Sequence, residues 1–65
     1  MDKYYQLYVS HDSKEFTLKQ CDKNNTIYKI QNFHLADNFI KESDLDNVIL
    51  KWHDRFGYSK VYINV

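Results

Sequence analysis

The segment 43–57, SDLDNVILKWHDRFG, predicts an amphipathic helix over about 44–56. Ser43 is a favourable N-cap, and Asp46 three residues later gives a pattern that resembles a capping box. Gly57 stands where helices commonly end in a left-handed residue. Apolar residues recur at spacings of three and four, which places them on one side of a helix: Leu45, Val48, Ile49, Trp52 and Phe56. This helix therefore needs an apolar surface to cover.

A β-sheet is the surface that the rest of the sequence predicts. Alternation of side chains with a period of two predicts strands over 3–10, 15–21, 26–32 and 59–65. The polar segments 11–14 and 22–25 are rich in Asp, Asn and Ser, which are typical of turns, so the first three strands are expected to form two hairpins. Within 33–42 the sequence leaves two readings open, a short helix with Leu35 and Phe39 on one face, or an irregular connection.

The order of these elements, βββαβ, predicts an α+β fold in a single small globular domain, 1–65. The sheet is expected to be four-stranded and mixed, in the favoured order 3-2-1-4, with the helix packed on one face. The first strand is placed in the middle because it carries apolar residues on both faces. The helix returns the chain so that the last strand lies parallel to the first or the third, through a right-handed crossover.

Composition narrows the class of protein. The 65 residues include one cysteine, which argues against a disulfide framework and a cysteine-rich zinc site. Eleven aromatic residues (six Tyr, four Phe and one Trp) supply the bulk that so short a chain needs for a core. The formal net charge of zero disfavours long-range attraction of nucleic acid. Without an apolar N-terminal h-region or a bilayer-length apolar run, the expected location is cytoplasmic.

Two patterns resemble catalytic groups but predict no enzyme. The segment 11–13, His-Asp-Ser, contains the residue types of a hydrolase triad, yet consecutive residues do not aim their side chains at one another as that mechanism requires. Cys21 could act as a nucleophile with His34 or His53 only if the fold joins them, and nothing near Cys21 in sequence would lower the pKa of its thiol.

Metal sites are equally weakly indicated. His34 with Asp37 and His53 with Asp54 are feasible pairs of ligands, but a structural zinc site usually needs four. The sequence therefore predicts a non-enzymatic protein without a metal or a cofactor.

Tyrosines and lysines give the strongest functional hypothesis. If the helix covers Tyr5, Leu7 and Val9, the alternate residues share the opposite, bare face of the sheet. Tyrosine is enriched in protein interfaces, and the same mixture of rings and ammonium groups can hold single-stranded nucleic acid. A purely structural role in cross-strand pairs is the third reading. The predicted binding residues are Tyr4, Tyr8, Lys19, Lys60 and Tyr62.

The favoured function is therefore binding or inhibition of another protein through this Tyr/Lys face or an edge strand. The alternative is binding of single-stranded nucleic acid by the same face. Uncovered edge strands also make a homodimer a hypothesis. Lys, Asn, Ile and Tyr together make up 25 of the 65 residues, a bias typical of AT-rich coding sequences, and this indicates an origin in a low-GC bacterium, or in a phage or mobile element within one.

Overall fold

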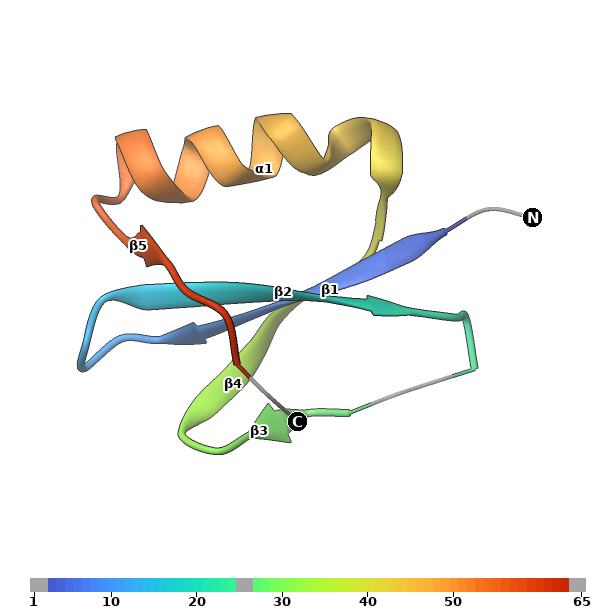
Figure 1. The fold of residues 1–65 in the computed structure, drawn as a ribbon, viewed down its shortest axis with the longest axis horizontal. Helices are drawn as coiled ribbons and strands as arrows, with labels where there is room; N and C mark the ends of the chain where they lie inside the picture. The colour runs from blue at the N-terminus through green and yellow to red at the C-terminus, as the bar shows by residue number, and fades with distance from the viewer. Residues whose placement is uncertain (1–2, 25–26, 64–65) are drawn as a thin grey trace.

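The computed structural model describes residues 3–24 and 27–63, and it confirms an α+β fold with a mixed sheet and one helix. The sheet has five strands in the order β3-β4-β1-β2-β5. Their bounds are β1 (Tyr4–Ser10), β2 (Glu15–Cys21), β3 (Lys29–Ile30), β4 (Phe33–Lys41) and β5 (Ser59–Lys60). Figure 1 shows the sheet almost edge-on, with the helical segment lying across one face.

The first strand is central, as the sequence predicts. β1 pairs antiparallel with β2 on one side and antiparallel with β4 on the other. It is buried on both faces, because each face of the sheet has its own apolar cluster. Toward the helix, Leu7, Val9, Phe16 and Ile40 form the first cluster. On the opposite face, Tyr8, Ile30 and Phe33 form the second.

The segment 33–42 is mostly a strand, which neither of the two readings of the sequence gave. β4 pairs with β1, but the register shifts twice, between Tyr5 and Leu7 and again between Leu7 and Tyr8. Each shift is a β-bulge, where the longer strand places an extra residue against its partner. Phe39 takes a φ of 55° there, a value uncommon for a residue other than glycine. The bulges break the period-two alternation, so the sequence pattern of a strand is lost.

The helical segment lies where the sequence predicts it, with a different start. It begins with a 3-10 turn (η1, Glu42–Asp44), continues as α1 (Leu45–Leu50) and ends in a π-helical turn (η2, Lys51–Arg55). Ser43 is not the N-cap: Lys41 occupies that position and makes no side-chain cap hydrogen bond. Since β4 runs directly into the helix without a loop, Ser43 already lies inside the first turn.

The end of the helix confirms one expectation and corrects another. Gly57 has a φ of 74°, the predicted left-handed residue. Phe56, however, is exposed and packs edge-on against Trp52 with ring centroids 4.8 Å apart. The wider π turn, closed by the Phe56 amide donating to the Lys51 carbonyl, rotates Phe56 away from the apolar stripe.

The last strand pairs with β2, and not with the first or third strand. β1 already has β2 and β4 as neighbours, so the outer edge of β2 is where the returning chain pairs. The pairing is parallel and joins Glu15 to Ser59 and Phe16 to Lys60. The predicted strand 59–65 is thus two residues long; the segment 61–63 is described but not strand, and Asn64 and Val65 lie outside the described residues.

Candidate functional site: the outer edge of strand β2

The second face of the sheet is covered, so two of the five predicted binding residues are not available there. Tyr8 is 0% exposed and Tyr4 is 9% exposed. Partly buried residues from three parts of the chain pack on the cluster that contains Tyr8: Ile27 before β3, Leu35 on β4, and Val61 and Ile63 after β5. The prediction that Tyr4 and Tyr8 lie on an exposed face is therefore wrong, because a second core forms under β1.

Tyr8 has the contacts of a structural side chain. Its hydroxyl lies 2.7 Å from Oε1 of Gln6 and 2.9 Å from the carbonyl oxygen of Ile27, two acceptors that share its single hydrogen. Burial raises the pKa of the Tyr8 hydroxyl above its usual value, and the neighbouring Cys21 raises it further. Tyr4 packs edge-on against Phe39, with the ammonium of Lys23 5.1 Å from the centre of the Tyr4 ring.

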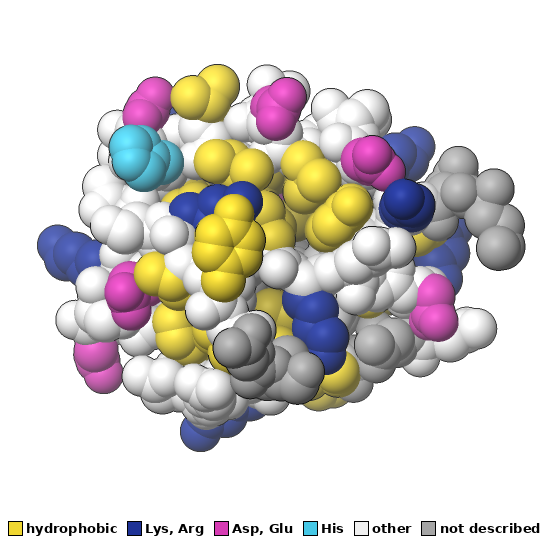
Figure 2. All heavy atoms as spheres, viewed as in Figure 1, with side chains coloured by type: hydrophobic (Ala, Val, Ile, Leu, Met, Phe, Trp, Pro, Cys, Tyr) yellow, Lys and Arg dark blue, Asp and Glu magenta, His cyan; other side chains and the backbone are white. Residues whose placement is uncertain are grey.

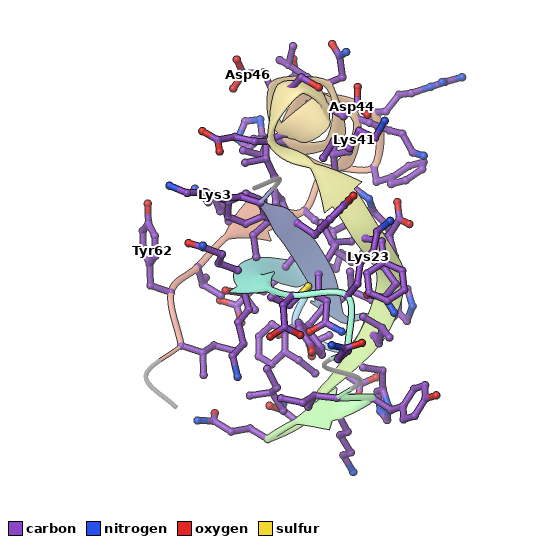
Figure 3. All side chains as sticks on the ribbon, turned by 90° about the vertical axis from the view of Figure 1, so that its right-hand side faces the viewer. Lys3, Lys23, Lys41, Asp44, Asp46 and Tyr62 are labelled. Carbon is purple, nitrogen blue, oxygen red and sulfur yellow. The ribbon has the colours of Figure 1, made fainter. Side chains whose placement is uncertain are left out.

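The other three predicted residues lie near one edge of the sheet. Tyr62 is 86% exposed, Lys60 is exposed and Lys19 is half-buried. The Lys60 ammonium lies 5.0 Å from the centre of the Tyr62 ring and 3.4 Å from its hydroxyl oxygen. In Figure 3, Tyr62 and Lys3 project on one side of the molecule, whereas Lys23 and Lys41 lie on the other, where β4 runs.

That side is the outer edge of β2, which β5 covers only at its beginning. The Ser59 amide donates to the Lys14 carbonyl and the Val61 amide donates to the Phe16 carbonyl, each within about 3 Å. Beyond Val61 the chain leaves β2: Val61 and Ile63 pack on the Tyr8 cluster, on the face away from the helix. Figure 1 shows this last segment passing from β5 across β2 to the side of the sheet opposite the helix.

Alternation along the strand then decides which backbone groups face outward. Successive residues of a strand direct their N–H and C=O groups to opposite sides. Because the Phe16 carbonyl meets β5, the groups of Leu18 and Gln20 also point to the outer edge, and those of Thr17 and Lys19 point to β1. Among the described residues, no strand pairs with Leu18 or Gln20 on that side. We call this stretch, Leu18–Gln20, the β2 edge.

Apolar side chains adjoin the β2 edge on its helix side. Leu18 is half-buried and packs on the cluster beneath the helix, as does Ile49. Ile49 lies on the same side of the helix as Asp46, which Figure 3 shows on the side of Tyr62. Figure 2 looks directly at this edge and shows apolar side chains gathered across its middle, with Lys or Arg side chains among them.

A hollow of about 430 Å³ lies on the opposite side of the helix. The bulged part of β4 forms one wall with Asp37 and Phe39, and the helix forms the other with Asp44 and Val48. Two acidic side chains in an open hollow do not by themselves define a ligand. We therefore assign no function to it.

The residues considered for catalysis are not brought together. Cys21 is a buried free thiol, and burial together with Asp22 raises its pKa, while Lys19 lowers it by less. A raised thiol pKa is the opposite of what nucleophilic cysteines show. His11 Nδ1 lies 2.6 Å from the Tyr58 hydroxyl, so this histidine contacts a tyrosine of the chain's other end.

The two candidate pairs of metal ligands lie on different elements, one on the helix and one on β4. His53 Nδ1 lies 2.8 Å from Oδ1 of Asp54, and both side chains are exposed on the helix. His34 and Asp37 are both exposed on β4, where they lie opposite Val9 and Leu7 with a register shift between them. Among the residues that the structure describes, no three His, Cys, Asp or Glu side chains are grouped to hold a metal ion.

Comparison of the chain with protein-family models, with curated proteins and with solved structures found no match. In the described part of the chain, no helix has both the length and the apolar character needed to cross a membrane.

Proposed function

We propose that this protein binds another protein by accepting one of its extended segments as an additional strand on the β2 edge. The observation that carries the proposal is the outward direction of the Leu18 and Gln20 backbone groups beside a β5 that ends early. A free row of N–H and C=O groups is a template for strand pairing. Strand addition to an exposed sheet edge is a recurring mode of peptide recognition.

The side chains around the edge fit this use. Leu18 and Ile49 offer apolar contact on the helix side. Tyr62, almost fully exposed, and Lys60 stand where the chain leaves β2. Tyrosine gives a large contact area at a low cost in conformational entropy, which is why it is frequent in binding surfaces. The β2 edge thus offers main-chain hydrogen bonds, which give affinity. The apolar side chains and the Tyr and Lys side chains beside it select the sequence of the partner's segment.

The proposal includes the role suggested by the sequence, that of a non-enzymatic inhibitor or modulator in the cytoplasm. In this role the protein acts on its partner by binding alone. While the partner's segment is paired with β2, it cannot make its other contacts. The buried free thiol of Cys21 fits a reducing compartment. A phage or mobile-element origin agrees with such a role and rests on composition alone.

Nucleic acid is the weaker alternative on this structure. Stacking platforms use several exposed rings beside basic groups. Of the three tyrosines expected on that face, Tyr4 and Tyr8 are buried, and Tyr62 alone is well exposed. We therefore do not propose nucleic acid as a second function.

The experiment compares two substitutions at one position, Gln20→Pro and Gln20→Val. Both remove the same side chain, and only proline removes the outward N–H and blocks the approaching strand. The partner is first purified from the protein's native cell and identified by mass spectrometry, and its Kd is then measured with each purified variant. Gln20→Pro is expected to weaken binding by about tenfold or more, and Gln20→Val by less than about threefold.

Circular dichroism of both variants serves as the control for folding. If folded Gln20→Pro binds the partner as tightly as Gln20→Val does, strand addition at this edge is not the mode of binding and the proposal fails.

A further inference from the structure

We infer that the segment added to the β2 edge is the C-terminal end of the partner chain, bound antiparallel to β2 with its free carboxylate beside Lys60. This inference rests on the proposed function. Two features of the edge lead to it: β5 fills the position next to β2 at one end, and a lysine without an acidic partner stands at that end. An added strand therefore has to stop where a positive charge lies.

The position beside β2 is open only beyond β5. The added strand and β5 would lie on the same side of β2, one after the other along its length. Lys60 is paired with Phe16, and the Val61 amide donates to the Phe16 carbonyl at 2.9 Å, so the first outward backbone groups open to a partner are those of Leu18. Successive residues of a strand are only about 3.3 Å apart, so a segment that continues straight past Leu18 would collide with Val61. The segment must end or bend away there.

A second copy of this chain does not meet this requirement. In an antiparallel pair of β2 edges that uses both outward residues, Leu18 of each copy lies opposite Gln20 of the other. Asp22 of the second copy would then lie opposite Phe16, which already pairs with Lys60. The same collision disfavours any straight internal strand of a partner, whereas a chain that ends at this point fits without a bend.

The direction of the added strand decides which chain end meets β5. An antiparallel strand reaches this point with its C-terminus, and a parallel strand reaches it with its N-terminus. The exposed side chain of Lys60 lies on the helix side of the sheet, as its partner Phe16 does, and its ammonium lies 3.4 Å from the Tyr62 hydroxyl oxygen. This ammonium attracts a terminal carboxylate and repels a terminal amine. The charge therefore favours the antiparallel direction and a C-terminal segment.

The end of the edge has donors for a carboxylate and no competing acid. The Leu18 N–H is the first outward donor, and Lys60 lies two residues away from it along β2, about 7 Å, which an extended lysine side chain can span. Among the described residues, Lys60 forms no ion pair. Glu15 points to the opposite face of the sheet, and Asp46 lies near the start of α1, whereas β5 follows the end of the helix. The C-terminal carboxylate would supply the missing negative charge.

Two synthetic peptides that differ only at the C-terminus test the inference. Both are N-acetylated and alternate Ser and Val; one ends in a free carboxylate and the other in a carboxamide. Each is titrated at low salt to millimolar concentration into the isotopically labelled full chain, and the amide resonances of β2 are followed by NMR. The carboxylate peptide is expected to shift Leu18 and Gln20 and to bind at least about tenfold more tightly than the carboxamide peptide.

Two lysine variants and a spin label locate the carboxylate. Lys60→Gln is expected to reduce the advantage of the carboxylate peptide to less than about threefold. Lys29→Gln, on the edge strand β3 at the other end of the sheet, is the matched control and is expected to leave the advantage unchanged. A nitroxide on the N-terminus of the carboxylate peptide is expected to broaden the Cys21 amide more than the Val61 amide, because an antiparallel segment directs its N-terminus away from β5.

The outcomes separate the inference from the proposed function. If both peptides shift Leu18 and Gln20 with equal affinity, or if Lys60→Gln keeps the full advantage of the carboxylate, the edge accepts strands but does not capture a C-terminus at Lys60. Stronger broadening of Val61 than of Cys21 would mean a parallel segment and would also overturn the inference. If neither peptide shifts Leu18 or Gln20, both the inference and the proposed function fail.

Discussion

Replacing Tyr8 with alanine is expected to lower the free energy of unfolding by about 3–5 kcal/mol, the cost typical of truncating a fully buried aromatic side chain. Tyr8 is 0% exposed and lies at the centre of the cluster that contains Ile30 and Phe33. A chain this short has a small total stability, so most of the Tyr8→Ala protein is expected to be unfolded at room temperature. Urea denaturation followed by the fluorescence of the single tryptophan, Trp52, gives the measurement.

Tyr62→Ala is the matched control. The sequence predicts both tyrosines on one face, but Tyr62 is 86% exposed and its ring contacts the Lys60 side chain. Its removal is expected to change the free energy of unfolding by no more than about 0.5 kcal/mol. Equal losses of stability in the two variants would mean that Tyr8 does not lie in a second core.

Proline at two successive positions of β2 is expected to have opposite consequences. Lys19→Pro removes an N–H that points to β1, opposite Gln6, and brings the ring against the neighbouring strand. Gln20→Pro removes an N–H that points to the outer edge, where proline is tolerated. We expect Lys19→Pro to be less stable than Gln20→Pro by at least about 2 kcal/mol, measured by urea denaturation.

Two alanine variants at the same positions show that side-chain loss does not produce this difference. Lys19→Ala and Gln20→Ala each keep the backbone N–H, and they are expected to differ from one another by less than about 1 kcal/mol. If Gln20→Pro unfolds the protein as Lys19→Pro does, the Gln20 amide is paired within the fold and the β2 edge is not free.

The helix and the central strand could be predicted from the sequence because both carry local patterns. Leu45, Val48 and Ile49 repeat with the helical period, and Gly57 marks the end. In β1, Leu7 and Val9 alternate with Tyr8, and all are apolar, which is the pattern of a strand covered on both sides.

β4 could not be predicted, because its pattern is altered by tertiary contacts. Its two bulges lie between Leu35, which joins one core, and Ile40, which joins the other, and they interrupt the alternation of side chains in the middle of the strand. Leu35 and Phe39, four residues apart, imitate a helical face. An interrupted alternation has no constant period in the sequence, so β4 can be recognised as a strand only from its pairing with β1.

The errors in the predicted binding residues also come from tertiary contacts that the sequence pattern does not contain. The sequence predicts a bare face for Tyr4 and Tyr8 because the predicted strand order gives that face no cover, whereas Ile30 and Ile63 pack around Tyr8 and Phe39 packs against Tyr4. Conversely, Leu18 and Gln20 have no unusual sequence feature. Their outward backbone groups follow from where β5 ends, which depends on the packing of Val61 and Ile63. The sequence predicts Lys19 as a binding residue from its charge, but it does not predict that Lys19 lies in the middle of an open edge.

Amide hydrogen exchange in dilute, unliganded protein tests the open β2 edge most directly. The structure predicts alternation: the Leu18 and Gln20 amides exchange rapidly, while those of Thr17 and Lys19, which point to β1, are protected by orders of magnitude. Uniform protection of all four amides at low protein concentration would mean that another part of the chain covers this edge, and the proposed binding site would not exist.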